Sequence, residues 1–329
     1  MTDLRLSAAL AALLLIAAAL SLFAGATPLG LDAVWRGLSG GEGLDALILR
    51  ELRVPRLLLG VMVGAGLGGA GAVLQGLFRN PLADPGVVGV SASAGVGAVI
   101  SLYFGIAGAF ALALPVAGVA GAALGVVALF VIAGRGASAT TLILAGVAVN
   151  AMAGAFTALL MNLSPNPWAL SEIAYWLMGS LADASWTELV FAAPLILPGL
   201  AILLTTCRAL DALSLGEDTA RSLGVDPRRL RLAAVAGTGL TVGAGVAVAG
   251  TIGFVGLIVP HLLRPLTGYQ PGALVLPSML GGALLVTLAD MAVRLISGPG
   301  MPLYLGVLTA LIGAPFFLWL VRSTQRRAP

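Results

Sequence analysis

The stretch at residues 53–78, "RVPRLLLGVMVGAGLGGAGAVLQGLF", decides the fold class. No charged residue lies between Arg56 and Arg79. An apolar stretch of roughly 20 residues is long enough to cross the hydrocarbon core of a bilayer as an α-helix. Its many glycines and alanines let helix backbones approach one another closely in lipid. The stretch therefore predicts a membrane-spanning helix that packs tightly against its neighbours.

The rest of the chain has the same character. Of its 329 residues 59% are hydrophobic and 9% are charged, whereas a soluble domain carries about 25% charged residues. The alternating segments typical of a membrane β-barrel are missing from the sequence. We expect an all-α polytopic membrane protein, with residues 1–329 forming a single transmembrane domain.

Hydropathy and turn signals predict about ten spans, several broken by Gly and Pro. A signal peptide is the alternative for the first one, but its apolar region is too long for that. The predicted spans are residues 6–26, 54–78, 86–104, 109–134, 139–161, 189–206, 232–249, 251–268, 277–296 and 303–321. A polar connector is expected at residues 27–52.

Arginine distribution predicts the orientation. With both termini in the cytoplasm, twelve arginines lie inside and five outside, in agreement with the positive-inside rule. The inside set is Arg5, Arg79, Arg135, Arg208, Arg221, Arg228, Arg229, Arg231, Arg264, Arg322, Arg326 and Arg327. The outside set is Arg36, Arg50, Arg53, Arg56 and Arg294. The motif "RELRVPR" at residues 50–56 thus lies on the outside, against the general trend, and requires its own explanation.

The residue inventory excludes several chemistries. All 17 basic residues are arginines, so the chain lacks the lysine of a phosphate-binding loop and of Schiff-base chemistry. A lone Cys207 and a single histidine provide neither an internal disulfide nor a histidine metal cluster. The isoelectric point near 9.6 reflects topology-marking arginines rather than binding of nucleic acid.

Residues 208–231 form the most polar stretch and contain helix start and stop signals. Ser214 and Glu217 fit a capping box, Gly224 fits a left-handed helix end, and Asp226-Pro227 fits the start of the next helix. These signals predict a short cytoplasmic helix of about two turns. It is either a well-capped connector or a docking helix for a soluble partner.

Four motifs resemble one family. The segment "ALSLGEDTARSLGV" is similar to the cytoplasmic coupling motif of the permease subunits that import iron chelates, haem and vitamin B12, which belong to ATP-binding-cassette (ABC) importers. Three further stretches resemble signatures of the same family, in the same order along the chain: "RVPRLLLGVMVGAGLGGAGAVLQGLFRNPLADPGVVGVSASAGVG", "GTIGFVGLIVPHLLR" and "LGVLTALIGAPFFLWLV". Together the motifs extend over residues 52–321.

This resemblance implies a ten-helix permease of the type II importer fold in the inner membrane of a bacterium. It implies a homodimeric channel, two ABC ATPase subunits that hold ATP and Mg, and a periplasmic substrate-binding protein. The permease itself is then neither an enzyme nor a cofactor-binding chain. The expected cargo is an iron compound (haem or a ferric siderophore) or cobalamin, which the sequence does not distinguish.

The resemblance also assigns roles to residues. The coupling segment would be seated in a groove of the ATPase through Leu215, Gly216, Glu217, Ala220, Arg221, Leu223 and Gly224. From spacing alone, Glu217 and Arg221 form an i,i+4 pair that stabilises an isolated helix slightly.

Three of the outside arginines match positions that contact acidic residues of the binding protein in this family: Arg53, Arg56 and Arg294. The planar guanidinium suits bidentate contact with a carboxylate. Anchoring to lipid headgroups is the alternative for Arg53 and Arg56. For Arg294 the alternative is pairing with Asp290, which lies one turn earlier.

The pathway is less legible. By resemblance, the helices near residues 140–161 and 303–321 line the channel, and Asn150 and Thr309 are their polar candidates. Ordinary hydrogen bonding between helices explains either residue equally well. His261 invites a role as haem ligand or proton carrier, but the family has the Pro260-His261 pair whatever its cargo, which favours a structural role.

A stand-alone secondary transporter or channel is the competing function. Ion-coupled carriers need acidic residues within the membrane, and Asp290 is the only acid clearly inside a predicted span. With Arg294 as its expected partner, Asp290 is poorly suited to ion coupling, so the importer permease is favoured.

Overall fold

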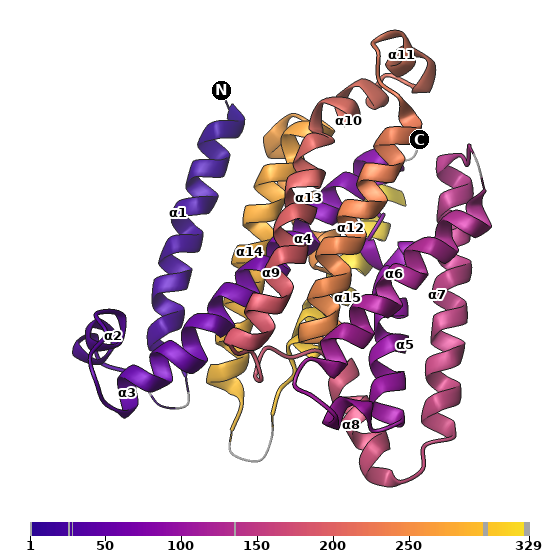
Figure 1. The fold of residues 1–329 in the computed structure, drawn as a ribbon. Helices are drawn as coiled ribbons and strands as arrows, with labels where there is room; N and C mark the ends of the chain where they lie inside the picture. Colours follow the sequence, from indigo (N-terminus) through magenta and orange to yellow (C-terminus); the bar gives the residue numbers. More distant parts are fainter. Residues whose placement is uncertain (1, 26, 28, 135, 299–301, 326–329) are drawn as a thin grey trace.

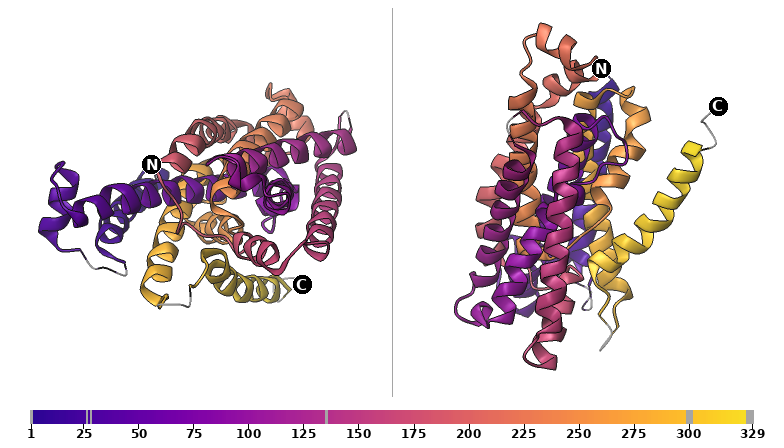
Figure 2. Two further views of the ribbon diagram at one scale, coloured as in Figure 1. Left: turned by 60° about the horizontal axis from the view of Figure 1, so that its bottom comes forward. Right: turned by 90° about the vertical axis from the view of Figure 1, so that its right-hand side faces the viewer.

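The computed structural model describes residues 2–25, 27, 29–134, 136–298 and 302–325. Throughout these residues the chain is helical or irregular, without a β-strand. The long helices run side by side as a bundle (Figure 1), and two further views show its depth (Figure 2). The all-α prediction is confirmed. Arg135, Arg326 and Arg327 of the predicted inside set lie outside the described residues.

The elements follow one another in this order: α1 (Thr2–Phe23), α2 (Leu31–Leu38), α3 (Leu44–Leu47), η1 (Ile48–Arg53), α4 (Val54–Leu77), η2 (Pro85–Val88), α5 (Val90–Tyr103), η3 (Ile106–Gly108), α6 (Ala113–Ala133), α7 (Ala139–Asn162), α8 (Pro167–Leu177), α9 (Trp186–Thr205), α10 (Cys207–Ser214), α11 (Glu217–Ser222), α12 (Pro227–Ala249), α13 (Val255–Leu263), η4 (Arg264–Thr267), α14 (Pro271–Ile296) and α15 (Leu305–Gln325). η1 is a π-helical turn and η2, η3 and η4 are 3-10 turns.

Within the described residues, seven helical segments are long and apolar enough to cross a membrane. They contain α1, α4, α6, α7, α9, α12 and α14. Three predicted spans correspond to shorter apolar helices, which are α5, α13 and α15. Length and composition therefore fix seven spans, and the count of about ten rests on these three shorter helices.

α4 lies at the centre of the bundle. In the most apolar part of each span, 72% of the residues are buried for the span containing α4, against 17% for α1. Along α4 the glycines permit backbone contact with α14: a Cβ on Gly64 would collide with the carbonyl oxygen of Gly282, and one on Gly68 with that of Ser278. The tight packing predicted from the Gly-rich stretch is confirmed.

The two ends of the bundle differ. α10 and α11 project from the end at which α1 begins, and α15 finishes toward the same end (Figures 1 and 2). α2, α3 and α8 lie at the opposite end (Figure 1). The connector at residues 27–52 is thus more ordered than predicted, because its apolar residues Leu29, Ala33, Val34 and Leu49 form a small core of their own.

Two breaks interrupt the bundle, one rich in Pro after α4 and one containing Gly after α12. α4 ends at Leu77, and a turn leads through η2 into α5. α12 ends at Ala249, and α13 starts after Phe254, which has φ +66°. His261 on α13 packs edge-on against Phe316 of α15, at 5.9 Å between ring centroids.

Candidate functional sites at the two ends

The projecting end consists of α10, α11 and the turn between them. Gly216, with φ +106°, separates the two helices and is the N-cap residue of α11. Ser214 is instead the last residue of α10, and its Oγ donates to the Asp211 carbonyl oxygen at 2.6 Å. The predicted capping box of Ser214 and Glu217 is therefore wrong. The left-handed conformation of Gly216 turns the chain after Ser214, so the serine belongs to the preceding helix.

The other signals in this segment are confirmed. Gly224 has φ +81°, and the Val225 N–H donates to the Ala220 carbonyl oxygen at 2.9 Å, which closes α11. Asp226 accepts from the Arg228 N–H at 2.8 Å, with Pro227 at the first position of α12. The result is a short, separately capped helix between two sharp turns.

Three ion pairs hold α11. Arg221 pairs with Glu217 at 3.3 Å, as predicted, and with Asp218 at 3.0 Å. Arg231 of α12 also reaches Glu217, at 3.1 Å, and its side chain is 11% exposed. This second partner of Glu217 ties α11 to the following span, and no local pattern in the sequence indicates it.

The surface of the segment is apolar as well as charged. Leu215 is 65% exposed and Leu223 is 62% exposed, whereas Ala220 is fully buried. Gly216 and Gly224 have open space where a Cβ would be. Of the seven predicted coupling residues, Ala220 faces inward and the two leucines flank α11 as exposed apolar contacts.

The opposite end gathers the three predicted docking arginines around one cavity. Arg53 is 7% exposed and donates to the carbonyl oxygens of Leu22, at 2.6 Å, and of Thr27. Its guanidinium thus closes the end of α1 rather than pointing into solvent.

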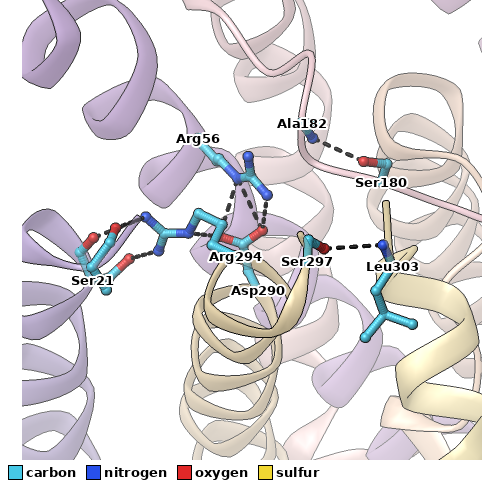
Figure 3. Close-up of polar contacts among 9 residues, drawn as sticks. Ser21, Arg56, Ser180, Ala182, Asp290, Arg294, Ser297 and Leu303 are labelled. Atoms are coloured by element: carbon cyan, nitrogen blue, oxygen red, sulfur yellow. Dashed lines mark hydrogen bonds and ion pairs between the residues drawn. The ribbon is translucent and has the colours of Figure 1, made fainter. Parts of the chain in front are cut away.

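Arg56 and Arg294 share one carboxylate. Arg56 Nη2 lies 2.7 Å from Asp290 Oδ1, and Arg294 Nε lies 3.1 Å from Asp290 Oδ2 (Figure 3). Arg294 also donates to the carbonyl oxygens of Ser21, at 3.0 Å, and Ala24, at 2.7 Å. The pairing of Arg294 with Asp290, considered as an alternative from the sequence, is present. The second pair, with Arg56, joins α4 to α14 and was not predicted.

The cavity at this end has a volume of about 1360 Å³. Besides the arginines, its wall includes Trp168, Glu172 and Tyr175 of α8, together with Asp183 and Tyr304. The rings of Tyr175 and Tyr304 stack at 5.8 Å and 8°. No pattern in the sequence predicted this cavity.

The two predicted pathway residues lie on separate parts of the bundle. Asn150 is on an exposed face of α7, which packs against α5 and α6. Thr309 is 4% exposed and donates to the Gly306 carbonyl oxygen at 3.1 Å within α15, which packs against α13 and α14.

A polytopic helical bundle with an apolar-tipped helix at one end and an arginine-lined cavity at the other has the layout of a membrane transport subunit. The chain belongs to the FecCD transport family, whose sequence model matches residues 13–323.

Named relatives agree with this family. The chain is 39% identical over 328 residues to the hemin transport system permease protein HmuU of Yersinia pestis, covering 96% of this chain and 95% of that protein. It is 42% identical over 288 residues to the vitamin B12 import system permease protein BtuC of Vibrio cholerae, covering 86% and 85%. Among solved structures, an inward-facing ABC transporter assigned to the metal-chelate type matches with a TM-score of 0.84 and 34% identity, over 97% of this chain and 99% of that one.

The chain is therefore a multi-pass membrane permease subunit of an ABC importer. Permease subunits of this family are not enzymes themselves and have no known cofactor of their own. Membership implies partner ATPase and substrate-binding subunits.

Proposed function

We propose that two copies of this chain form a channel that takes an iron compound or cobalamin from a periplasmic binding protein and releases it into the cytoplasm. Two partner ATPase subunits bind ATP and Mg and carry out the hydrolysis that drives transport. The observation that carries this proposal is the α10–α11 projection: a capped helix with exposed leucines on a chain that has no lysine for a phosphate-binding loop.

The projection is suited to transmit force. α11 is held by three ion pairs and ends at defined turns, so a push on it moves it as a body. Leu215 and Leu223 supply apolar area for a groove on the ATPase. Gly216 and Gly224 leave room for close approach of the partner.

The arginine cluster is suited to receive an acidic partner. Three guanidinium groups lie around the cavity, and within the described residues Asp290 is their ion-pair partner. Glu172, Asp183 and Glu188 share the cavity wall, so the positive charge is local to the arginine cluster. Such a field attracts carboxylates of an approaching protein and sets the encounter rate and orientation more than the affinity. In this role Arg56 retains donors that Asp290 does not use, and Arg53 and Arg294 contribute mainly through their charge.

The exposed apolar faces of α7 and α15 support a homodimer. On α7 the exposed side chains include Leu144, Val147, Met152 and Phe156, and on α15 they include Leu311, Ile312 and Leu318. We propose that these helices meet at the dimer axis, where Asn150 faces the pathway and Thr309 lies one layer behind it. The remaining apolar surface contacts the bilayer.

The α11 end is assigned to the cytoplasm of a bacterial cell with an inner membrane. Arg221, Arg228, Arg229 and Arg231 lie at that end, in agreement with the positive-inside rule. The same orientation puts both termini inside, which needs an even number of spans such as ten, and opens the cavity to the periplasm.

The cargo is proposed from the relatives and the cavity. Relatives are named for haem and vitamin B12. A cavity of about 1360 Å³ is larger than the usual pocket for a drug-sized ligand, which fits a bulky chelate such as haem, a ferric siderophore or cobalamin. We favour an iron compound.

The proposal is tested by purifying the chain from its native membrane, identifying its partners by mass spectrometry, and reconstituting the complex in proteoliposomes. We expect a co-purifying ATPase with a phosphate-binding loop and uptake of labelled haem, ferric siderophore or cobalamin that requires ATP. Uptake by the chain alone, without any ATPase, would support the stand-alone carrier instead.

A further inference from the structure

One helix connects the two candidate sites. α14 begins beside α10 at the coupling end and finishes at the arginine cluster (Figure 1). Its 26 residues span about 39 Å at 1.5 Å per residue, which is enough to cross the bundle. α4 also extends from Arg56 at the cluster to Gly76 beside Leu210 of α10, but the side-chain hydrogen bond from α10 is made to α14.

At the coupling end, α10 is joined to the first turn of α14. Asp211 of α10 accepts from the Gly272 N–H through Oδ1 at 2.7 Å. The first N–H groups of a helix have no partner within the helix, and an acidic group there is favoured by the helix dipole. The N-cap residue of α14, Gln270, makes no side-chain cap, so a residue of the coupling segment supplies it.

The same joint is closely packed. A Cβ on Gly272 would collide with the Cys207 carbonyl oxygen and would lie 2.6 Å from Asp211 Oδ2. Leu210, the neighbour of Asp211, is fully buried, and a Cβ on Gly76 of α4 would contact both it and Pro271. α10 therefore lies directly against the start of α14 and the end of α4.

Along its middle, α14 is locked to α4. Gly64, Gly68 and Gly282 bring the two backbones into contact, as described above. Helices in backbone contact have no side chains that re-pack to let them slide past each other. α4 and α14 thus move together when one of them is displaced.

At the far end, both members of this pair hold the arginine cluster. Asp290 of α14 binds Arg56 of α4, and Arg294 of α14 binds the end of α1. A displacement of the pair necessarily moves Arg56 and Arg294 relative to the periplasmic partner.

We infer that Asp211 is a positioning residue that passes the displacement of the coupling segment to α14, and through it to the external arginine cluster. This inference rests on the proposed function. Asp211 touches neither the nucleotide nor the cargo. It acts by keeping α10 attached to the first turn of α14 while the ATPases push on α11.

The test uses the reconstituted complex with its ATPases and binding protein, and a reporter at the external end of α14. Ile296 is 66% exposed there, so Ile296→Cys in a Cys207→Ser background provides one labelling site. Two quantities are measured: the change in labelling rate on adding ATP and Mg, and the cargo transported per ATP hydrolysed.

Three variants address the joint from both sides. Asp211→Ala removes the acceptor, Asp211→Asn keeps an acceptor oxygen without the charge, and Gly272→Ala pushes the two helices apart. The matched control is Asp32→Ala on α2, another exposed acid, which pairs with Arg36 at 2.9 Å far from the joint.

We expect Asp211→Ala and Gly272→Ala to abolish most of the labelling change and to lower cargo per ATP at least several-fold, while ATP hydrolysis continues. Asp211→Asn should restore much of both, and Asp32→Ala should match the background. A merely structural residue would lower stability and all activities together, without uncoupling the two ends.

Unchanged labelling response and unchanged cargo per ATP in both Asp211→Ala and Gly272→Ala would overturn the inference and leave the proposed function intact. A background complex with neither ATP-driven uptake nor a labelling response would instead overturn the proposed function, and this inference with it.

Discussion

The two ends of the bundle carry their charges in opposite ways. At the coupling end, Arg221 is 56% exposed and pairs with acids three and four residues away. At the arginine end, Arg294 is 11% and Asp290 is 6% exposed, and the partners of the cluster come from three helices. Exposed pairs contribute about 0–1 kcal/mol, whereas removing one partner of a buried pair costs about 3–5 kcal/mol.

The difference follows from what each end does in the proposed mechanism. A helix that is pushed as a body needs local stiffness, which short-range pairs and caps provide. A cluster that holds three helices together and still presents charge needs a buried counter-ion. The same residue types thus act as local stiffeners at one end and as a tertiary clamp at the other.

The largest effect is expected from removing the shared carboxylate. Asp290→Ala leaves Arg56 and Arg294 buried without a counter-charge and should cost about 3–5 kcal/mol of stability. Asp218→Ala, at the coupling end, should cost less than about 1 kcal/mol. Thermal unfolding of the two purified variants in the same detergent measures the difference. Equal losses would show that the clamp at the arginine end is no stronger than an exposed pair.

The next effect concerns the stiffness of α11. The Ala220 N–H donates to the Gly216 carbonyl oxygen at 2.9 Å, so Ala220→Pro removes this bond and should break the helix at a cost of about 3 kcal/mol. Glu217→Pro falls at the first position of α11, where proline is tolerated.

For these two proline variants we expect cargo per ATP to fall at least about tenfold in Ala220→Pro and much less in Glu217→Pro, in which only the ion pairs are lost. Uptake and hydrolysis assayed in proteoliposomes give the ratio. Equal coupling in both variants would contradict the lever.

A smaller effect is expected for docking. Arg56→Gln keeps a polar side chain beside Asp290 but removes one positive charge, and should slow association of the binding protein about tenfold at low salt. The loss should shrink at high salt because exposed charges are screened within about 10 Å at 0.1 M. Association rates by surface plasmon resonance at two salt concentrations distinguish this from a salt-independent loss, which would indicate a change of shape instead.

The smallest effect is expected for Arg231, whose salt bridge at the coupling end is more buried than the others there. Arg231 is the one mostly buried member of the α11 ion pairs, with 11% of its side chain exposed. Arg231→Ala should cost about 1 kcal/mol, more than Arg221→Ala, since it removes the tie between α11 and α12. Comparison of the two melting temperatures measures this; a larger loss for Arg221→Ala would mean that local pairs dominate at this end.

The two ends also differ in how far the sequence predicted them, because one depends on local contacts and the other on contacts between distant helices. The end of the coupling helix at Gly224, the Asp226-Pro227 start of the next helix and the Glu217–Arg221 pair depend on neighbours within a few residues, so local rules predicted them. The one local error, the capping box at Ser214, arose because Gly216 could take a conformation that ended α10 first. The salt bridge from Arg231 was missed since it depends on how the chain turns back at Gly224.

At the arginine end, the sequence supplied the residues but not their partners. Arg56 and Asp290 are separated by 234 positions and Arg294 and Ser21 by 273. Pairing with Asp290 was foreseen for Arg294, one helical turn away, and not for Arg56. No periodic pattern in the sequence indicated the π-helical turn before α4 or the cavity beside α8.

The sequence by itself determined that the chain is an all-α membrane protein, that its Gly-rich stretch packs tightly, and which family it resembles. These follow from composition, from the many small residues of that stretch, and from motifs that need only their own order along the chain. The tertiary structure alone decided that Asp290 is shared by two arginines, that Asp211 caps α14, and that α14, packed against α4, joins the two ends. Such contacts join residues far apart in sequence, and their geometry exists only once the helices have packed.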